Sequence, residues 1–153
     1  MGKIAFVFPG QGAQVVGMGQ NVYENSAVAK DVFEQASKAV DLDLKALCFE
    51  ENNDINITEF TQVCLLTTSV AIMEELKTRG VKADVAAGLS LGEYCALVAA
   101  GSMNFVDAAK AVRKRGIFMQ DCPIRILLYI KSGRCLMQQP LLLFTCYSDH
   151  SPV

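Results

Sequence analysis

A serine nucleophile is the first chemistry that the sequence suggests. The pentapeptide GLSLG at positions 88–92 places Ser90 between two glycines, after an apolar run and before a helix-like run. A turn of this kind between a strand and a helix is so tight that the residues two before and two after the serine must be small. The serine then lies at a helix N-terminus, where backbone N–H groups can hold an oxyanion. The N–H of Leu91 is the expected donor.

The base for this serine is not evident. Serine is a poor nucleophile at its free pKa and needs an adjacent base. The only histidine, His150, lies 60 residues after Ser90 and three residues from the end of the sequence. We expect His150 to be a solvated residue at a frayed terminus, and we assign it no catalytic role.

The elements that must position Ser90 alternate between strands and helices. We expect strands over Lys3–Phe8 and Asp84–Ala87, because both are short apolar runs next to turn residues. Helical spacing predicts the remaining elements, which are Val22–Val40, the short turn Asp43–Phe49, Thr61–Arg79, Leu91–Ala100 and Val106–Gln120. This alternation predicts an α/β fold with a parallel sheet.

Capping residues support the helix boundaries. Asn25 or Ser26 can cap the helix that ends at Val40, and Asn104 can cap the last helix, with Asp107 as the acid of a capping box. Gly80 stops the longest helix. On the first long helix, the spacing places five apolar side chains on one face, namely Val28, Val32, Phe33, Ala36 and Val40.

Residues 122–153 differ in kind from residues 1–121. They hold three of the four prolines, three of the six cysteines and a single acid. Strands are expected only at 126–130 and 141–144. The sequence therefore predicts an ordered unit over 1–121 and a poorly ordered tail over 122–153. The abrupt change fits translation out of frame after about residue 121, which sequencing of the gene would test.

Composition excludes several classes of function. A net charge of −2 is too weak to indicate nucleic acid or an anionic membrane as partner. No run of apolar residues is long enough to span a membrane, and the N-terminus does not resemble a signal peptide. The six cysteines form no CxxC pair, so we expect no metal site. Free thiols and a cytoplasmic location are the corresponding expectations.

Three further motifs accompany the serine. FVFPGQGAQ (6–14) follows the first strand, TQVCLL (61–66) opens the long helix, and RKRGIFMQ (113–120) closes the last one. In this order, with GLSLGEY (88–94) before the last motif, residues 3–120 resemble the malonyl-CoA:acyl carrier protein transacylases. The acyltransferase domains of polyketide synthases are similar. Only the N-terminal part of that family's domain is matched.

The resemblance implies a fold, partners and roles. The fold is the α/β-hydrolase-like core of the acyltransferases, here incomplete and without the ferredoxin-like subdomain. Ser90 takes the malonyl group from malonyl-CoA and passes it to the phosphopantetheine thiol of acyl carrier protein. The backbone N–H of Gln11 is the second oxyanion donor beside Leu91, Arg115 pairs with the malonate carboxylate, and Gln62 lines the pocket. The family is usually monomeric, acts in fatty acid synthesis and holds no permanent cofactor.

Each assignment has a plainer alternative. Arg115 can belong to a solvated basic helix end together with Arg113 and Lys114. Gln62 can be an ordinary polar residue at a helix start. The glycines at 10 and 12 can simply form a turn, and they are not a dinucleotide-binding fingerprint because Val15 stands where a glycine is needed.

Three functions remain open at this stage. The first is a malonyl transferase whose activity in this chain is reduced by about 10³-fold or more, because the base is missing. The second is another serine hydrolase, such as an esterase or a patatin-like lipase, which would prefer uncharged esters. The third is a non-catalytic fragment that binds coenzyme A, the carrier protein or a complementing half.

Overall fold

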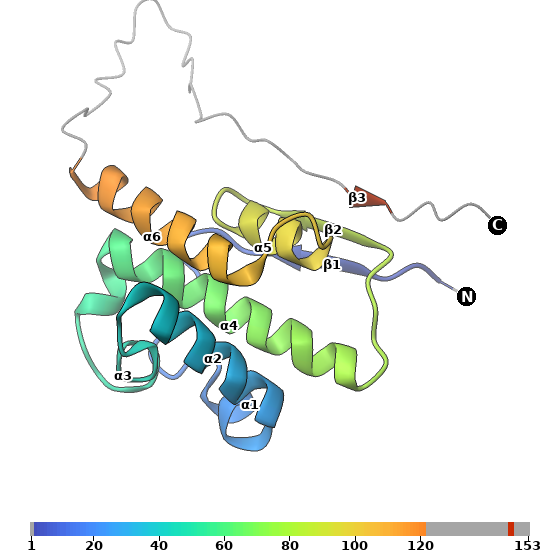
Figure 1. Ribbon diagram of the computed structural model, residues 1–153, viewed down its shortest axis with the longest axis horizontal. Helices are drawn as coiled ribbons and strands as arrows, with labels where there is room; N and C mark the ends of the chain where they lie inside the picture. Colours follow the sequence, from blue (N-terminus) through green and yellow to red (C-terminus); the bar gives the residue numbers. More distant parts are fainter. Residues whose placement is uncertain (1, 122–146, 149–153) are drawn as a thin grey trace, which may run out of the picture.

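The long helix α4 lies at the centre of the structure. The computed structural model describes residues 2–121 and 147–148, and Figure 1 shows α4 between the strands and α5 on one side and α1, α2 and α3 on the other. In chain order the elements are β1 (Ala5–Phe8), α1 (Gln20–Asn25), α2 (Ala27–Val40), α3 (Leu44–Phe49), a 3-10 turn η1 (Asp54–Asn56), α4 (Thr58–Thr78), β2 (Val85–Gly88), α5 (Gly92–Ala99), α6 (Phe105–Asp121) and β3 (Tyr147–Ser148).

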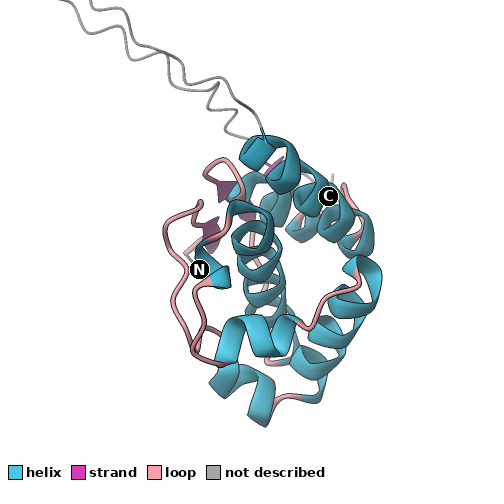
Figure 2. Cartoon of the chain, turned by 90° about the vertical axis from the view of Figure 1, so that its left-hand side faces the viewer, coloured by secondary structure: helices cyan, strands magenta, loops and turns pink. Residues whose placement is uncertain are grey.

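The sheet is small, and its first two strands are parallel as the sequence predicts. β1 pairs with β2 in the register Ala5↔Val85 to Phe8↔Gly88, and β3 pairs with the other edge of β2 in the antiparallel sense. Figure 2 shows the strands gathered at one side of a mostly helical body. An antiparallel strand at 147–148 is not predicted by the sequence. The two strands expected at 126–130 and 141–144 lie outside the described residues.

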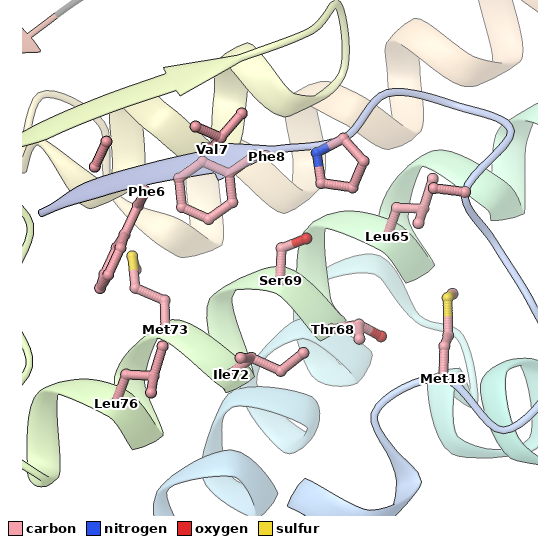
Figure 3. A pocket seen from close by; sticks show the side chains of 13 residues that line it. Phe6, Val7, Phe8, Met18, Leu65, Thr68, Ser69, Ile72, Met73 and Leu76 are labelled. Carbon is pink, nitrogen blue, oxygen red and sulfur yellow. The ribbon is translucent and has the colours of Figure 1, made fainter.

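An apolar pocket lies between β1 and α4. It encloses about 350 Å³, and Figure 3 shows Phe6, Val7 and Phe8 on the strand side with Thr68, Ile72 and Met73 on the helix side. None of the five predicted site residues lines it. The pocket is therefore separate from the serine.

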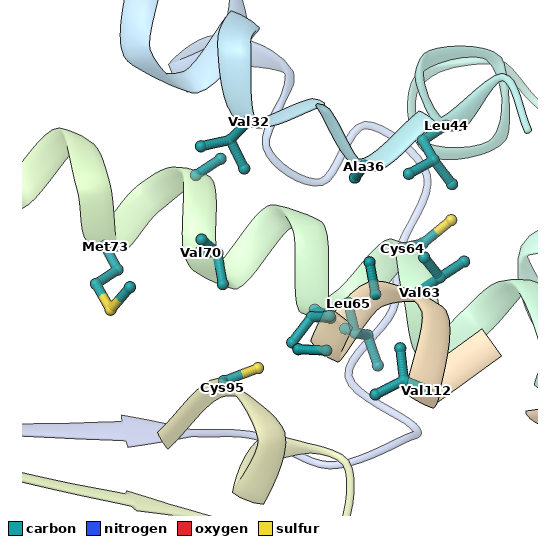
Figure 4. Close-up of a cluster of buried hydrophobic side chains, with 14 of the residues drawn as sticks. Val32, Ala36, Leu44, Val63, Cys64, Leu65, Val70, Met73, Cys95 and Val112 are labelled. Atoms are coloured by element: carbon teal, nitrogen blue, oxygen red, sulfur yellow. The ribbon is translucent and has the colours of Figure 1, made fainter. Parts of the chain in front are cut away.

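The core forms around the middle of α4. The residues from Thr61 to Thr68, together with Val70, Ala71 and Met73, are buried, as expected for a helix covered on every face. Figure 4 shows Val32 and Ala36 of α2 packing on one side of α4, with Cys95 of α5 on the other. Burying this surface is the main source of stability for a domain of this kind.

Two helices replace the single helix predicted over Val22–Val40. The chain is extended at Ser26, with φ −128° and ψ 122°, and the Ser26 hydroxyl accepts a hydrogen bond from the Ala29 N–H at 3.1 Å. Ser26 therefore ends α1 and caps α2. Four of the five apolar residues expected on one face of this helix are buried, together with Ala29, whereas Val28 is 36% exposed.

The other helix predictions are confirmed with shifts at their ends. α4 begins at Thr58, three residues before the predicted start, and ends at Thr78, with Gly80 at φ 79° directly beyond its C-terminus. The Asn104 side chain accepts a hydrogen bond from the Val106 N–H at 2.9 Å, so Asn104 caps α6 as expected.

The described cysteines are buried free thiols, and we expect them to react slowly. Burial raises the pKa of Cys95 to about 12, and a hydrogen bond with Cys48 together with burial raises the pKa of Cys64. A raised pKa leaves little of the reactive thiolate of Cys64 and Cys95 near neutral pH, and burial keeps the reagent away from Cys48. Iodoacetamide at pH 8, followed by peptide mass spectrometry, should leave all three unmodified in the native protein and label them in urea. Rapid labelling of the native protein would contradict this packing.

Candidate active site

Ser90 lies on a strained turn between β2 and α5. It adopts the left-handed conformation with φ 54°, which is uncommon for a residue with a side chain. A Cβ atom on Gly88 would lie 2.0 Å from the carbonyl group of Gly92, and a Cβ on Gly92 would lie 2.3 Å from the Phe8 carbonyl oxygen. Both flanking positions must therefore be glycine, as the motif predicts.

The loop after β1 approaches the same turn. A Cβ atom on Gly10 would lie 2.9 Å from the carbonyl oxygen of Leu89, so this loop packs against the turn through its backbone. The next residue, Gln11, is exposed, and its side-chain amide donates a hydrogen bond to the Thr58 hydroxyl at 3.2 Å. The loop is thus connected both to the serine turn and to the start of α4.

In the part of the chain that the structure describes, the backbone N–H of Leu91, next to the serine, and that of Gln11, in the loop after β1, have no acceptor. Within residues 2–121, neither the Gln11 nor the Leu91 amide N–H donates a hydrogen bond to another group of the protein. The Leu91 side chain is fully buried, which fixes the backbone at the start of α5. Unpaired N–H groups near a helix N-terminus favour a negatively charged oxygen.

Arg115 connects the serine to α4. Its Nη2 donates a hydrogen bond to the Ser90 Oγ at 2.8 Å, and its Nη1 donates one to the Gln62 Oε1 at 2.6 Å. Gln62 is fully buried, and its Nε2 lies 3.3 Å from the sulfur of Met119. The structure therefore brings together three of the predicted site residues, which come from α6, α4 and the turn before α5.

The basic run at 113–115 does not behave as one solvated helix end. Lys114 is exposed, whereas Arg113 forms an ion pair with Glu59 at 3.1 Å. Arg115 is partly buried and uses two of its nitrogens in side-chain hydrogen bonds. The solvated alternative therefore fits Lys114 only.

The sequence analysis misses residues that support the site. Thr58 accepts from the Gln11 side chain, and its own N–H donates to the Gln120 side chain at 3.3 Å. Met119 contacts the buried Gln62 amide. Met119 and Gln120 belong to the RKRGIFMQ motif, which is a signal that could have identified them. Thr58 carries no such signal, because it lies outside every motif.

The described residues place no general base beside Ser90. Arg115 is the only hydrogen-bond partner of its hydroxyl within residues 2–121, and a guanidinium has donors but no acceptor. His150 lies outside the described residues. The same described part holds no group of three or more side chains that could bind a metal ion. None of its helices is long and apolar enough to cross a membrane.

Comparison with known proteins shows the family of the chain. Residues 5–124 match the family model of the acyl transferase domain, and the chain belongs to that family. Over 122 residues it is 48% identical to the malonyl CoA-acyl carrier protein transacylase of Bacillus subtilis, a match that covers 79% of this chain and 38% of the relative. The chain thus spans less than half the length of such relatives.

Solved structures that resemble this chain also belong to malonyl transacylases. The crystal structure of the transacylase from Clostridium perfringens superimposes with a TM-score of 0.76 at 47% identity, covering 78% of this chain and 38% of that one. A complex of a type II polyketide acyl-carrier protein with its malonyl-transacylase matches with a TM-score of 0.74 at 40% identity, covering 78% and 39%. The resemblance predicted from the four motifs is confirmed.

Substitution of Gly88 by alanine should strongly destabilise the protein. The added methyl group would lie 2.0 Å from backbone atoms of Gly92, so the turn must open or unfold. We expect a loss of about 3 kcal/mol or more in the free energy of unfolding, measured in urea. Gly2→Ala is the matched control, because a Cβ at Gly2 meets nothing within 4 Å. Equal stability of the two variants would contradict the close turn.

Proposed function

We propose that the site around Ser90 serves malonyl transfer from malonyl-CoA to the phosphopantetheine thiol of an acyl carrier protein, through a malonyl ester on Ser90. The chain alone is expected to have strongly reduced activity, because residues 2–121 hold no base beside the serine. The observation that carries the proposal is the position of Arg115, whose guanidinium lies 2.8 Å from the Ser90 hydroxyl on the strained turn. Arginine beside a nucleophilic serine is the arrangement that an acyl group with a free carboxylate requires. Fatty acid synthesis is the proposed pathway, because the matched bacterial relatives bear the transacylase name.

Recognition of the carboxylate follows from the geometry of the guanidinium. Malonyl differs from acetyl by one carboxylate, two bonds beyond the reacting carbonyl carbon. A planar guanidinium can hold such a group through two parallel charge-assisted hydrogen bonds, which the ammonium group of lysine cannot reproduce. The bond from Arg115 to the buried Gln62 oxygen supports this orientation before substrate binds. An acetyl group would leave the guanidinium without that partner, which penalises the wrong substrate.

Two backbone amides are proposed to stabilise the negative charge that develops on the thioester oxygen. We place this oxyanion between the N–H groups of Leu91 and Gln11, which have no acceptor within residues 2–121. Burial of the Leu91 side chain and the close approach of Gly10 to the serine turn hold these two N–H groups in place. Donors that are already oriented need no rearrangement during the reaction, which is why such sites accelerate acyl transfer.

The reaction divides into two acyl transfers. The Ser90 oxygen attacks the thioester carbon, the carbon–sulfur bond breaks and coenzyme A leaves, which produces the serine ester. The thiol of the carrier then attacks this ester and releases the serine. The two transfers need a group that accepts the proton of the Ser90 hydroxyl in the first step and returns it in the second. The described residues supply no such group beside Ser90. The role of base is left unassigned.

An acyl carrier protein is the proposed acceptor. The support is the solved complex of a polyketide acyl-carrier protein with its malonyl-transacylase, which matches 78% of this chain. No permanent cofactor is part of the proposal, since coenzyme A enters and leaves as substrate and product.

Calorimetric measurement of malonyl-CoA and acetyl-CoA binding tests which acyl group the site recognises. The wild-type chain should bind malonyl-CoA more tightly than acetyl-CoA. Arg115→Gln should weaken malonyl-CoA binding by about 10- to 100-fold, the usual value of hydrogen bonds to a charged group, and leave acetyl-CoA nearly unchanged. Lys110→Gln removes the same charge from an exposed position on the same helix and is the control.

The outcomes separate the alternatives. Equal binding of both thioesters by the wild-type chain would contradict carboxylate recognition. Hydrolysis of uncharged aryl esters with no preference for malonyl-CoA would instead favour a serine hydrolase. Tight binding without any acyl transfer, even with carrier protein present, would favour a fragment that only binds.

Labelling of the serine tests the mechanism. Because no base adjoins Ser90 in residues 2–121, the chain alone should show no burst of malonyl-serine formation when mixed with malonyl-CoA and followed by intact-protein mass spectrometry. Its acylation should be slower by about 10³-fold than that of a full-length relative. Stoichiometric and rapid labelling that disappears in Ser90→Ala would show that a base is present after all.

A further inference from the structure

We propose that Arg113 and Glu59 are positioning residues, whose ion pair sets the rotation of α6 about its own axis and thereby places the guanidinium of Arg115. Within residues 2–121, no side-chain hydrogen bond joins either residue to Ser90 or Gln62. The effect on substrate choice rests on the function proposed above. The placement of Arg115 does not rest on the proposed function, because it is a property of the folded chain alone.

The first support is the set of contacts that Arg113 makes. Its Nη2 lies 3.1 Å and its Nε 3.2 Å from the same Glu59 oxygen, and its Nη1 donates to the carbonyl oxygen of Val40. The side chains of Arg113 and Glu59 are only 28% and 24% exposed. One arginine thus connects α6 to the first turn of α4 and to the last residue of α2.

The second support is the close approach of α6 to α4 at Gly116. A Cβ atom there would lie 2.7 Å from the Glu59 Cα and 2.9 Å from the carbonyl oxygen of Thr58. The two helices therefore meet through backbone atoms at this point. A contact without a side chain lets the helices approach closely, and it supplies no interlocking group that would prevent α6 from rotating. The buried residues Ala108, Ala109 and Val112 hold the first half of α6, and beyond them the contacts of Arg113 and Arg115 limit its rotation.

The two arginines lie on opposite sides of this contact. At about 100° per residue, Arg113 and Arg115 are about 200° apart around the helix, and Gly116 lies between them. Arg113 reaches Glu59, and Arg115 reaches Gln62, which is three positions further along the same face of α4. A rotation of α6 that moves one arginine toward α4 moves the other away. Loss of the Arg113 pair should therefore displace Arg115.

Arg113→Gln tests this proposal, with Lys114→Gln as the matched control. Both substitutions remove one positive charge from neighbouring positions of α6, but Lys114 is exposed and forms no ion pair within residues 2–121. The measured quantity is the ratio of the malonyl-CoA and acetyl-CoA dissociation constants. We expect Arg113→Gln to reduce the preference for malonyl-CoA about fivefold, with acetyl-CoA binding unchanged. Lys114→Gln should keep the wild-type ratio.

Further variants distinguish positioning from general loss of structure. Glu59→Gln should have the same effect as Arg113→Gln, and the double variant should be no worse than either single one, because all three remove one interaction. Arg113→Lys keeps a charge for Glu59 and should recover part of the preference. Equal weakening of both thioesters in Arg113→Gln would indicate a merely structural role and would overturn the proposal.

A readout without substrate keeps the two proposals separable. The side-chain Nε–H signal of Arg115 in a nitrogen-15 spectrum, assigned by its loss in Arg115→Lys, should be sharp in the wild-type chain and in Lys114→Gln. It should broaden or shift in Arg113→Gln. If the wild-type chain shows no preference for malonyl-CoA, the proposed function fails and this signal still decides the positioning. An unchanged Arg115 signal in Arg113→Gln would overturn the inference.

Discussion

A guanidinium can donate hydrogen bonds but cannot accept them, and the arrangement around Ser90 depends on this property. Arg115 needs acceptors on the protein if it is to be ordered without substrate. The serine hydroxyl supplies one at 2.8 Å and the Gln62 carbonyl supplies another at 2.6 Å. Gln62 can serve because it is fully buried and its own amide group faces Met119. Arg115 is therefore held between the Ser90 hydroxyl and the Gln62 side chain, which are the groups that the proposed function joins.

The helix α4 supplies both the core and the support of the site. Its middle is buried among α2, α5 and α6, and this fixes the helix in place. Its first turns carry Thr58, Glu59 and Gln62, which contact the loop after β1 and two arginines of α6. The partners that hold the guanidinium of Arg115 thus belong to a helix that is itself fixed by apolar packing further along its length. A rigid element gives better precision at such a site than a loop does.

The features that the sequence could predict are those that depend on neighbouring residues. The turn at 88–92 requires glycines within five positions, so its geometry follows from the motif. The contact of Arg115 with Gln62 joins positions 53 apart, and only the resemblance to a family indicated that they meet. Ser26 is predicted as a cap and does cap α2, but the separate helix before it was missed because the apolar spacing continues across the break. The antiparallel pairing of β3 depends on the tertiary path and leaves no local pattern.

The angle between Arg113 and Arg115 around the helix also fixes the number of residues that separate them. Removal or insertion of one residue between them would turn the following part of the helix by about 100° and shift it by about 1.5 Å. The guanidinium would then face away from the serine, even though every residue type were retained. Substitutions at exposed positions of α6 are compatible with the site, but a change in the number of residues in this segment is not. Among members of the family, gaps in this segment should therefore be selected against more strongly than substitutions at its exposed positions.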